Sequence, residues 1–197
     1  AGVSGQFADC GIHALHMASF VAGQDPVELS ADFVSCLPTR TLEDDAMVSF
    51  KMSGGAVLRL WTSSVAIGRM HGLNIQVFGE KGGLRWAQEW PNQLYWTPLN
   101  GRTEILERGG SGLSPEADRA SRVTIGHAEG MPLAFANIYA DLAEVISAKR
   151  EGKSPNPLAC NYPKALDGLL SMAAISAAVD SAARGGAWTD ARPPSRR

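Results

Sequence analysis

The chain has 197 residues, 45% of them hydrophobic, and a formal net charge of −2. This length predicts one domain, over residues 1–192, that buries enough surface to fold without disulfides or metals. The small net charge excludes a general electrostatic attraction to nucleic acid or to an anionic membrane, and no apolar run reaches the roughly 20 residues of a membrane span. The basic end, residues 193–197, is expected to be a solvated, disordered tail.

The cysteines indicate the cellular compartment of the protein, and the first residues indicate whether the sequence is a whole protein. The three cysteines, Cys10, Cys36 and Cys160, are far apart and odd in number, and no C-x-x-C motif occurs. This pattern favours a reducing compartment, and since no signal peptide is recognisable we expect a cytoplasmic location. The chain opens without methionine, so we expect it to be part of a larger protein.

Hydrophobic spacing predicts a helix, then a run of strands, then two helices. Residues 9–22 carry apolar side chains at helical spacing, whereas later segments alternate apolar and polar residues as half-buried strands do. The expected strands are 27–33, 46–52, 57–64, 73–78, 84–88, 93–97 and 103–106, with glycine hairpin turns at 54–55 and 79–83. Residues 107–126 are expected to be irregular, and the closing helices to cover 130–149 and 162–183.

This order of elements is typical of an α+β fold. Sequential hairpins favour a predominantly antiparallel, open sheet with the helices packed on one face. The other sheet face also carries large side chains, and nothing left in the sequence can cover it. We therefore expect that face to bind a second copy of the chain, most simply in a homodimer.

The first helix carries polar residues suited to chemistry. Asp9, His13 and His16 are four and three residues apart, so a helix places their side chains on one face. A carboxylate beside an imidazole is a proton-transfer pair, because it orients the ring and stabilises its protonated form. A surface ion pair has the same spacing and stays open as an alternative.

The same three residues match the donor set of a facial metal triad. They span about 10 Å of helix axis, since each residue rises roughly 1.5 Å, so one ion cannot easily bind all three. His16 is therefore expected to pack or to form hydrogen bonds, and no metal is expected.

A second polar segment, residues 126–130, stands just before a helix. His127 lies where a loop enters that helix, a place suited to substrate contact, whereas helix capping adequately explains Glu129. The glycines of 79–83 lack a following helix, so we interpret them as a hairpin turn rather than a phosphate-binding loop.

Several segments, in the same order, resemble the C-terminal domain of the Gfo/Idh/MocA oxidoreductases (glucose–fructose oxidoreductase, inositol dehydrogenase and relatives). They are the D-x-x-x-H of Asp9 and His13, the T-L-E-D-D-A of 41–46 leading into a Gly-Gly hairpin, the G-x-x-G-x-L-x-W of 79–86, the G-H-A-E-G of 126–130 with A-F-A-N-I-Y at 134–139, and the Y-P of 162–163 with D-G at 167–168 and Trp188. The resemblance covers nearly the whole chain.

The resemblance implies a two-domain dehydrogenase dependent on NAD or NADP. An N-terminal Rossmann domain, absent here, would bind the dinucleotide, so this chain would carry no cofactor-binding residue and would not turn over alone. Its own part would be to bind a small sugar or cyclitol and to form a homodimer or tetramer. His13 would transfer the proton with Asp9 as its partner, and His127, His16 and His71 would be substrate-binding residues.

Two residues differ from the family's usual pattern, and two alternative functions stay open. His71 stands where many relatives carry Asn, and Ala128 where one branch usually carries Pro, which leaves the substrate open. One alternative is a non-catalytic dimerisation or ligand-binding module of the same fold. The other is a metal-dependent hydrolase or oxygenase with a metal at Asp9 and His13.

Overall fold

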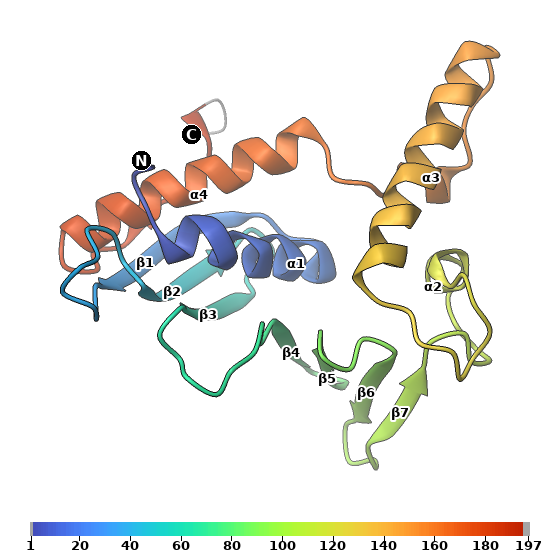
Figure 1. Cartoon of the computed structure of the whole chain (residues 1–197), viewed down its shortest axis with the longest axis horizontal. Helices are drawn as coiled ribbons and strands as arrows, with labels where there is room; N and C mark the ends of the chain where they lie inside the picture. The colour runs from blue at the N-terminus through green and yellow to red at the C-terminus, as the bar shows by residue number, and fades with distance from the viewer. Residues whose placement is uncertain (1, 195–197) are drawn as a thin grey trace. The chain divides into compact units, whose positions relative to one another are not determined.

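The structure, a computed structural model, describes residues 2–194 and divides into two compact units (Figure 1). The first unit consists of Ala1–Met70 and Lys164–Arg197, and the second of His71–Pro163. From the sequence we expected one domain. In the structure, residues 71–163 form a compact unit with its own sheet and helices.

The first unit is a four-stranded sheet with helices on one face. Its elements are the π-helical turn η1 (Phe7–Gly11), helix α1 (Ile12–Ala22), strands β1 (Pro26–Val34), β2 (Asp45–Met52) and β3 (Val57–Ser63), helix α4 (Ala165–Ala183) and the short strand β8 (Thr189–Asp190). All neighbours pair antiparallel, in the order β3-β2-β1-β8.

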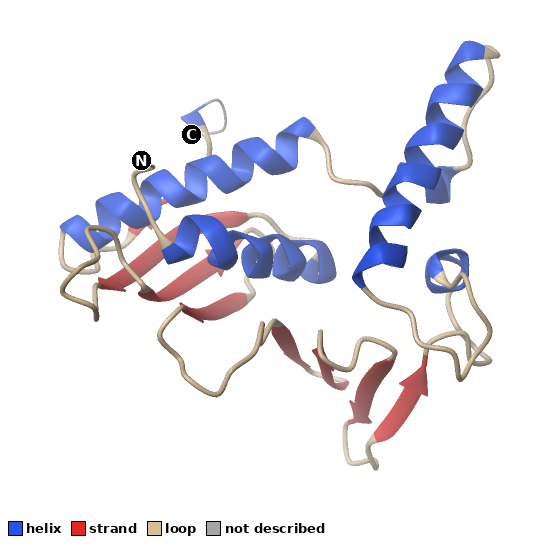
Figure 2. Ribbon diagram, in the orientation of Figure 1, coloured by secondary structure: helices blue, strands red, loops and turns tan. Residues whose placement is uncertain are grey.

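The alternation along β2 decides which sheet face is covered. Its core-facing residues are buried: Ala46, Val48, Phe50 and Met52. Met47 and Lys51 point to the opposite face and are exposed. Helix α4 packs on β1, and α1 packs against α4, so both helices cover the buried face (Figure 2). The expectation of helices on one face of an antiparallel sheet is confirmed for this unit.

Helix α4 is apolar because it belongs to the core. Among residues 2–194 one helical segment, Pro157–Ala183, is long and apolar enough by length and composition to cross a membrane. In the fold, however, Ala174, Ala177 and Ala178 are buried in the core cluster, and α4 packs on β1. We therefore interpret the segment as ending in a core helix.

The second unit is an antiparallel meander followed by helices. It contains strands β4 (Asn74–Gly79), β5 (Gly82–Ala87), β6 (Gln93–Pro98) and β7 (Glu104–Glu107), helices α2 (Pro115–Ala120) and α3 (Met131–Arg150), and the 3-10 turn η2 (Pro157–Cys160). The strands pair in sequence order. Arg119 of α2 bridges Asp141 and Glu144 of α3, at 2.7 Å to each carboxylate, and so ties the two helices together.

Some elements differ from the sequence expectations. The strands form two sheets rather than one, because the segment between β3 and β4 turns through Gly68 and Gly72, both at positive φ, and pairs with neither sheet. Strand β8 was not expected, since two residues carry no periodic signal. Helix α2 lies in the stretch expected to be irregular. Pro193, expected in a disordered tail, is fully buried, and residues 195–197 lie outside the described part of the chain.

The buried carboxylate of Asp44 gives the first unit an acid-sensitive contact. It accepts hydrogen bonds from the backbone N–H groups of Cys36 (2.7 Å) and Leu37 (3.1 Å). The Cys36 amide is the main cause that lowers the pKa of Asp44 below its ordinary 3.8. Because the folded pKa is depressed, the stabilisation is fully present above that ordinary value and is lost as pH falls through the folded one.

We expect Asp44→Asn to lower the melting temperature at neutral pH. The deficit relative to the unmodified protein should shrink on acidification below about pH 4, where the native carboxylate itself becomes protonated. Thermal unfolding across an acid pH series measures this. Asp32→Asn, at an exposed position, is the control. A melting-temperature deficit that stays constant with pH would contradict the assignment.

Candidate active site

The first helix presents a carboxylate and an imidazole to solvent. Asp9 lies inside the π-turn η1, and His13 is the second residue of α1; both side chains are exposed. Neither makes a hydrogen bond or ion pair within residues 2–194, so both are free to meet a ligand. The turn is π-helical because the N–H of Ile12 donates to the carbonyl of Phe7, five residues back. Such turns contain one extra residue and are frequent at functional sites.

A buried glutamate holds the start of this helix. One carboxylate oxygen of Glu43, Oε1, accepts from the hydroxyl of Ser4 at 2.6 Å and from the N–H groups of Gly5 and Phe7 at 2.7 and 3.1 Å. The Ser4 hydroxyl in turn accepts from the N–H of Ala8 at 3.2 Å. The N–H groups that a helix start leaves unpaired are thus partly satisfied by side chains.

Close packing fixes the other end of the turn. Gly11 lies so near β3 that an added Cβ would be 2.6 Å from the Phe7 ring and 3.1 Å from the Thr62 methyl. The Gln6 amide donates to the Thr62 hydroxyl at 3.0 Å, and Phe7 is fully buried. Glycine at position 11 therefore lets the helix lie directly on β3, which leaves the side bearing Asp9 and His13 outward.

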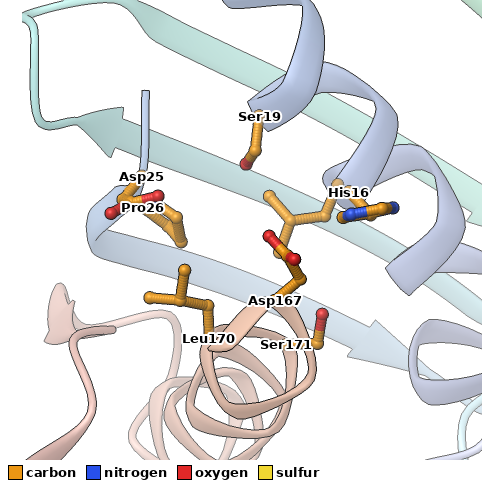
Figure 3. Close-up of a pocket in the computed structure, with 8 residues that line it drawn as sticks. His16, Ser19, Asp25, Pro26, Asp167, Leu170 and Ser171 are labelled. Atoms are coloured by element: carbon orange, nitrogen blue, oxygen red, sulfur yellow. The ribbon is translucent and has the colours of Figure 1, made fainter. Parts of the chain in front are cut away.

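His16 has different surroundings from Asp9 and His13. It is half-buried and lines a small pocket, partly open to solvent, between α1, the start of β1 and α4. Figure 3 shows Ser19 and Asp25 on one side of this pocket and Asp167 and Ser171 of α4 on the other; Leu15, Pro26 and Leu170 complete the lining. An Asp167 oxygen accepts from the Lys164 N–H at 2.6 Å and caps α4.

The other two candidate histidines belong to the second unit. His71 is exposed at the start of that unit, and His127 is exposed in the loop before α3. The His127 loop is held by Arg108, which donates to the carbonyls of Val123 (2.8 Å) and His127. The structure thus places Asp9, His13 and His16 along η1 and α1 of the first unit, and His71 and His127 in the second unit.

Glu129 does not cap α3, contrary to the interpretation from sequence. The helix begins after Gly130 with no side-chain cap. The Glu129 carboxylate is instead buried: it pairs with Arg108 at 2.8 Å and accepts from the N–H groups of Arg122 and Val123, each at 2.6 Å. The carboxylate therefore pairs with Arg108, 21 positions earlier in the chain, rather than with the N-terminus of α3. The local spacing of residues does not predict this long-range ion pair.

The described residues also bear on metals and cofactors. Over residues 2–194 no group of three His, Cys, Asp or Glu side chains is placed to hold a metal ion. Gly79 and Gly82 join β4 to β5 in a hairpin, as the sequence predicted, so no helix follows these glycines to offer its N-terminus to a phosphate.

Glu43 is the residue of this site that sequence reasoning missed. It stands in the acidic run 43–45, where neighbouring carboxylates are ordinarily solvated, yet it is only 8% exposed. The signal available was its position just before a buried strand, where a solvated charge is out of place. Its partners, 36–39 residues earlier, are visible only in the fold.

Comparisons with known proteins show that this chain is similar to oxidoreductases. Residues 1–85, which include Asp9, His13 and Glu43, match the family model described as GFO/IDH/MocA C-terminal domain. An uncharacterized oxidoreductase of Bacillus subtilis, YfiI, is 31% identical over 192 residues, which make up 96% of this chain and 49% of the relative.

Solved structures show the same similarity. An oxidoreductase from Sinorhizobium meliloti is 41% identical with a TM-score of 0.87, over 93% of this chain and 51% of that one. An inositol dehydrogenase homolog from Azotobacter vinelandii, complexed with NADH and myo-inositol, is 33% identical with a TM-score of 0.87, over 96% of this chain and 50% of that one. The chain spans about half the length of the relatives it matches. By sequence over residues 1–85 the chain matches the C-terminal domain of the Gfo/Idh/MocA family, and by fold it is similar to the matching half of these oxidoreductases.

Proposed function

We propose that the chain is the substrate-binding and proton-transferring domain of an oxidoreductase that acts on a CH–OH group of a small polyol, either a sugar or a cyclitol. The observation that carries this proposal is the exposed pair of Asp9 and His13, on a helix held in place by buried contacts. The similarity to an inositol dehydrogenase homolog complexed with NADH and myo-inositol supports the substrate class.

In this proposal His13 exchanges a proton with the substrate hydroxyl. A neutral imidazole takes the proton as the alcohol is oxidised, and the Asp9 carboxylate stabilises the imidazolium that forms. A nicotinamide cofactor, NAD or NADP, supplies the hydride acceptor when it is bound. Because the chain spans about half the length of the relatives it matches, we assign dinucleotide binding to a further domain of the full-length protein, and we expect the isolated chain to be inactive.

Three further histidines are proposed substrate-binding residues, one in the first unit and two in the second. His16 borders the pocket beside α4, and His71 and His127 offer exposed rings in the second unit. Each imidazole can donate or accept one hydrogen bond in its neutral form, which suits recognition of hydroxyl groups. We assign them to substrate binding rather than to proton transfer, because none of the three lies four residues from an exposed carboxylate on the same helix.

We also propose that the chain forms a homodimer or tetramer and that it is cytoplasmic. The face of the first sheet opposite the helices exposes Met47, Val57 and Trp61, at 49–62% of their surface. A second copy of the chain placed there would remove this apolar surface from water in a homodimer or tetramer. The free thiols of Cys10, Cys36 and Cys160 are compatible with a reducing, cytoplasmic location.

Turnover by the full-length protein tests the proposed function. Purified protein is mixed with NAD or NADP and a panel of myo-inositol, aldoses and acyclic polyols, and nicotinamide reduction is followed by absorbance. We expect reduction with at least one polyol and none with the chain 1–197 alone. Polyol binding without turnover by any cofactor would favour a non-catalytic ligand-binding module instead, and metal-dependent hydrolysis would refute the proposal outright.

A further inference from the structure

We propose that Glu43 is a positioning residue for the Asp9–His13 pair: its buried carboxylate holds the π-turn that sets the direction of Asp9 relative to His13. This inference rests on the proposed function, since it concerns the same site. Glu43 is not a catalytic residue in this proposal, because it contacts only the residues that begin the helix.

The contacts show how strongly the carboxylate holds the segment before Asp9. Three donors, the Ser4 hydroxyl and the N–H groups of Gly5 and Phe7, converge on a single oxygen within 3.1 Å. The N–H of Gln6 donates to the backbone carbonyl of Glu43, also at 3.1 Å. Residues 4–7 are thus attached to one residue by four hydrogen bonds. Bonds to a buried, charged acceptor are stronger than neutral ones, since they replace the water that the carboxylate has lost.

The π-turn explains why this attachment affects the site. The extra residue of a π-turn rotates the residues before it, relative to the residues after it, by about the 100° that one residue adds to an α-helix. Asp9 lies within the turn, whereas His13 lies beyond it in α1. If the turn relaxed to α-helical form, Asp9 would change direction while His13 kept its place on the sheet-packed helix.

Restraints at both ends keep the turn from relaxing. At its end, Gly11 is in close contact with Phe7 and Thr62. At its start, Phe7 is fixed by burial and by its N–H bond to Glu43. Isolated π-turns are rare, so this one depends on contacts from outside the helix. Of these contacts, the Glu43 carboxylate is the one that a single conservative substitution can weaken without changing the core.

The test compares two variants of Glu43 with a matched control in the full-length protein. Glu43→Ala removes the acceptor, whereas Glu43→Gln keeps one acceptor oxygen but loses the charge. Asp44→Asn is the control: this neighbouring carboxylate is also buried, but it binds the N–H groups of Cys36 and Leu37, far from the helix in the chain. All proteins are assayed below the start of their thermal unfolding transitions.

We expect Glu43→Ala to lower kcat about 10- to 100-fold with the KM for the nicotinamide cofactor unchanged, because a small misplacement of reacting groups costs rate. Glu43→Gln should recover part of that loss, and Asp44→Asn should stay within about twofold of the unmodified kcat. Equal effects of Glu43→Ala and Asp44→Asn, or an unchanged kcat in Glu43→Ala, would overturn the inference. An active His13→Ala protein would instead overturn the proposed function, so the two failures are distinguishable.

Discussion

Replacing His13 by alanine in the full-length protein is expected to lower kcat by about 10²- to 10⁴-fold, the usual contribution of a positioned general acid or base. The side chain is exposed and makes no hydrogen bond within residues 2–194, so its removal should leave the fold intact. The loss should fall mainly on kcat and not on the KM for the cofactor, because the proposal assigns dinucleotide binding to a further domain. Steady-state kinetics with a polyol substrate and the preferred nicotinamide measures it.

Chemical rescue distinguishes loss of the base from a general disturbance. Added imidazole should restore part of the rate to His13→Ala, because a small free base can occupy the space left by the side chain and accept the proton. Asp9→Asn keeps the imidazole and should lose less, about 10-fold, with no response to added imidazole. His13→Ala with the kcat of the unmodified protein would exclude His13 as the proton-transfer residue.

The sequence was a good guide to the elements that carry a periodic pattern. Strands β1 to β7 lie within two residues of the expected ranges, because a strand with one buried face alternates apolar and polar residues. Helix α4 begins at Ala165, later than expected, because Asp167 is part of its capping box rather than of the helix interior. The six-residue helix α2 is too short for periodicity, and only the Ser114-Pro115 start signal predicts it.

The sequence indicated which residues of the first helix are candidates for the site, but not the geometry of that helix. The spacing of Asp9 and His13 predicted a shared helix, and both side chains are exposed as a site requires. His16 was expected to pack or to form hydrogen bonds, and it is half-buried beside α4. The π-turn has no sequence signature of its own. It depends on a carboxylate more than 30 residues later in the chain, and long-range contacts of this kind are not encoded in local periodicity.

Gly5→Ala is the second substitution from which we expect a large effect. An added Cβ would lie 2.4 Å from the backbone carbonyl oxygen of Glu43 and 3.1 Å from the Cβ of Leu42. A backbone atom cannot rotate away as a side chain can, so the segment must shift and its hydrogen bonds to Glu43 must lengthen. Overpacking of this kind costs about 1–3 kcal/mol, which corresponds to a fall in melting temperature of roughly 3–10 °C for a domain of this size.

The matched control for Gly5→Ala is the same substitution at a glycine with open surroundings. Gly168 lies in α4 with nothing within 4 Å of an added Cβ, so Gly168→Ala should raise stability by up to about 1 kcal/mol through better helix propensity. If the close approach at Gly5 is real, thermal unfolding of the full-length variants gives a lower melting temperature for Gly5→Ala and a higher one for Gly168→Ala. The shifted segment also leads directly into η1, so Gly5→Ala should lower kcat together with stability, whereas Gly168→Ala should change stability alone. A Gly5→Ala protein as stable and as active as the unmodified one would show that the helix start tolerates displacement, and that Asp9 and His13 need no such support.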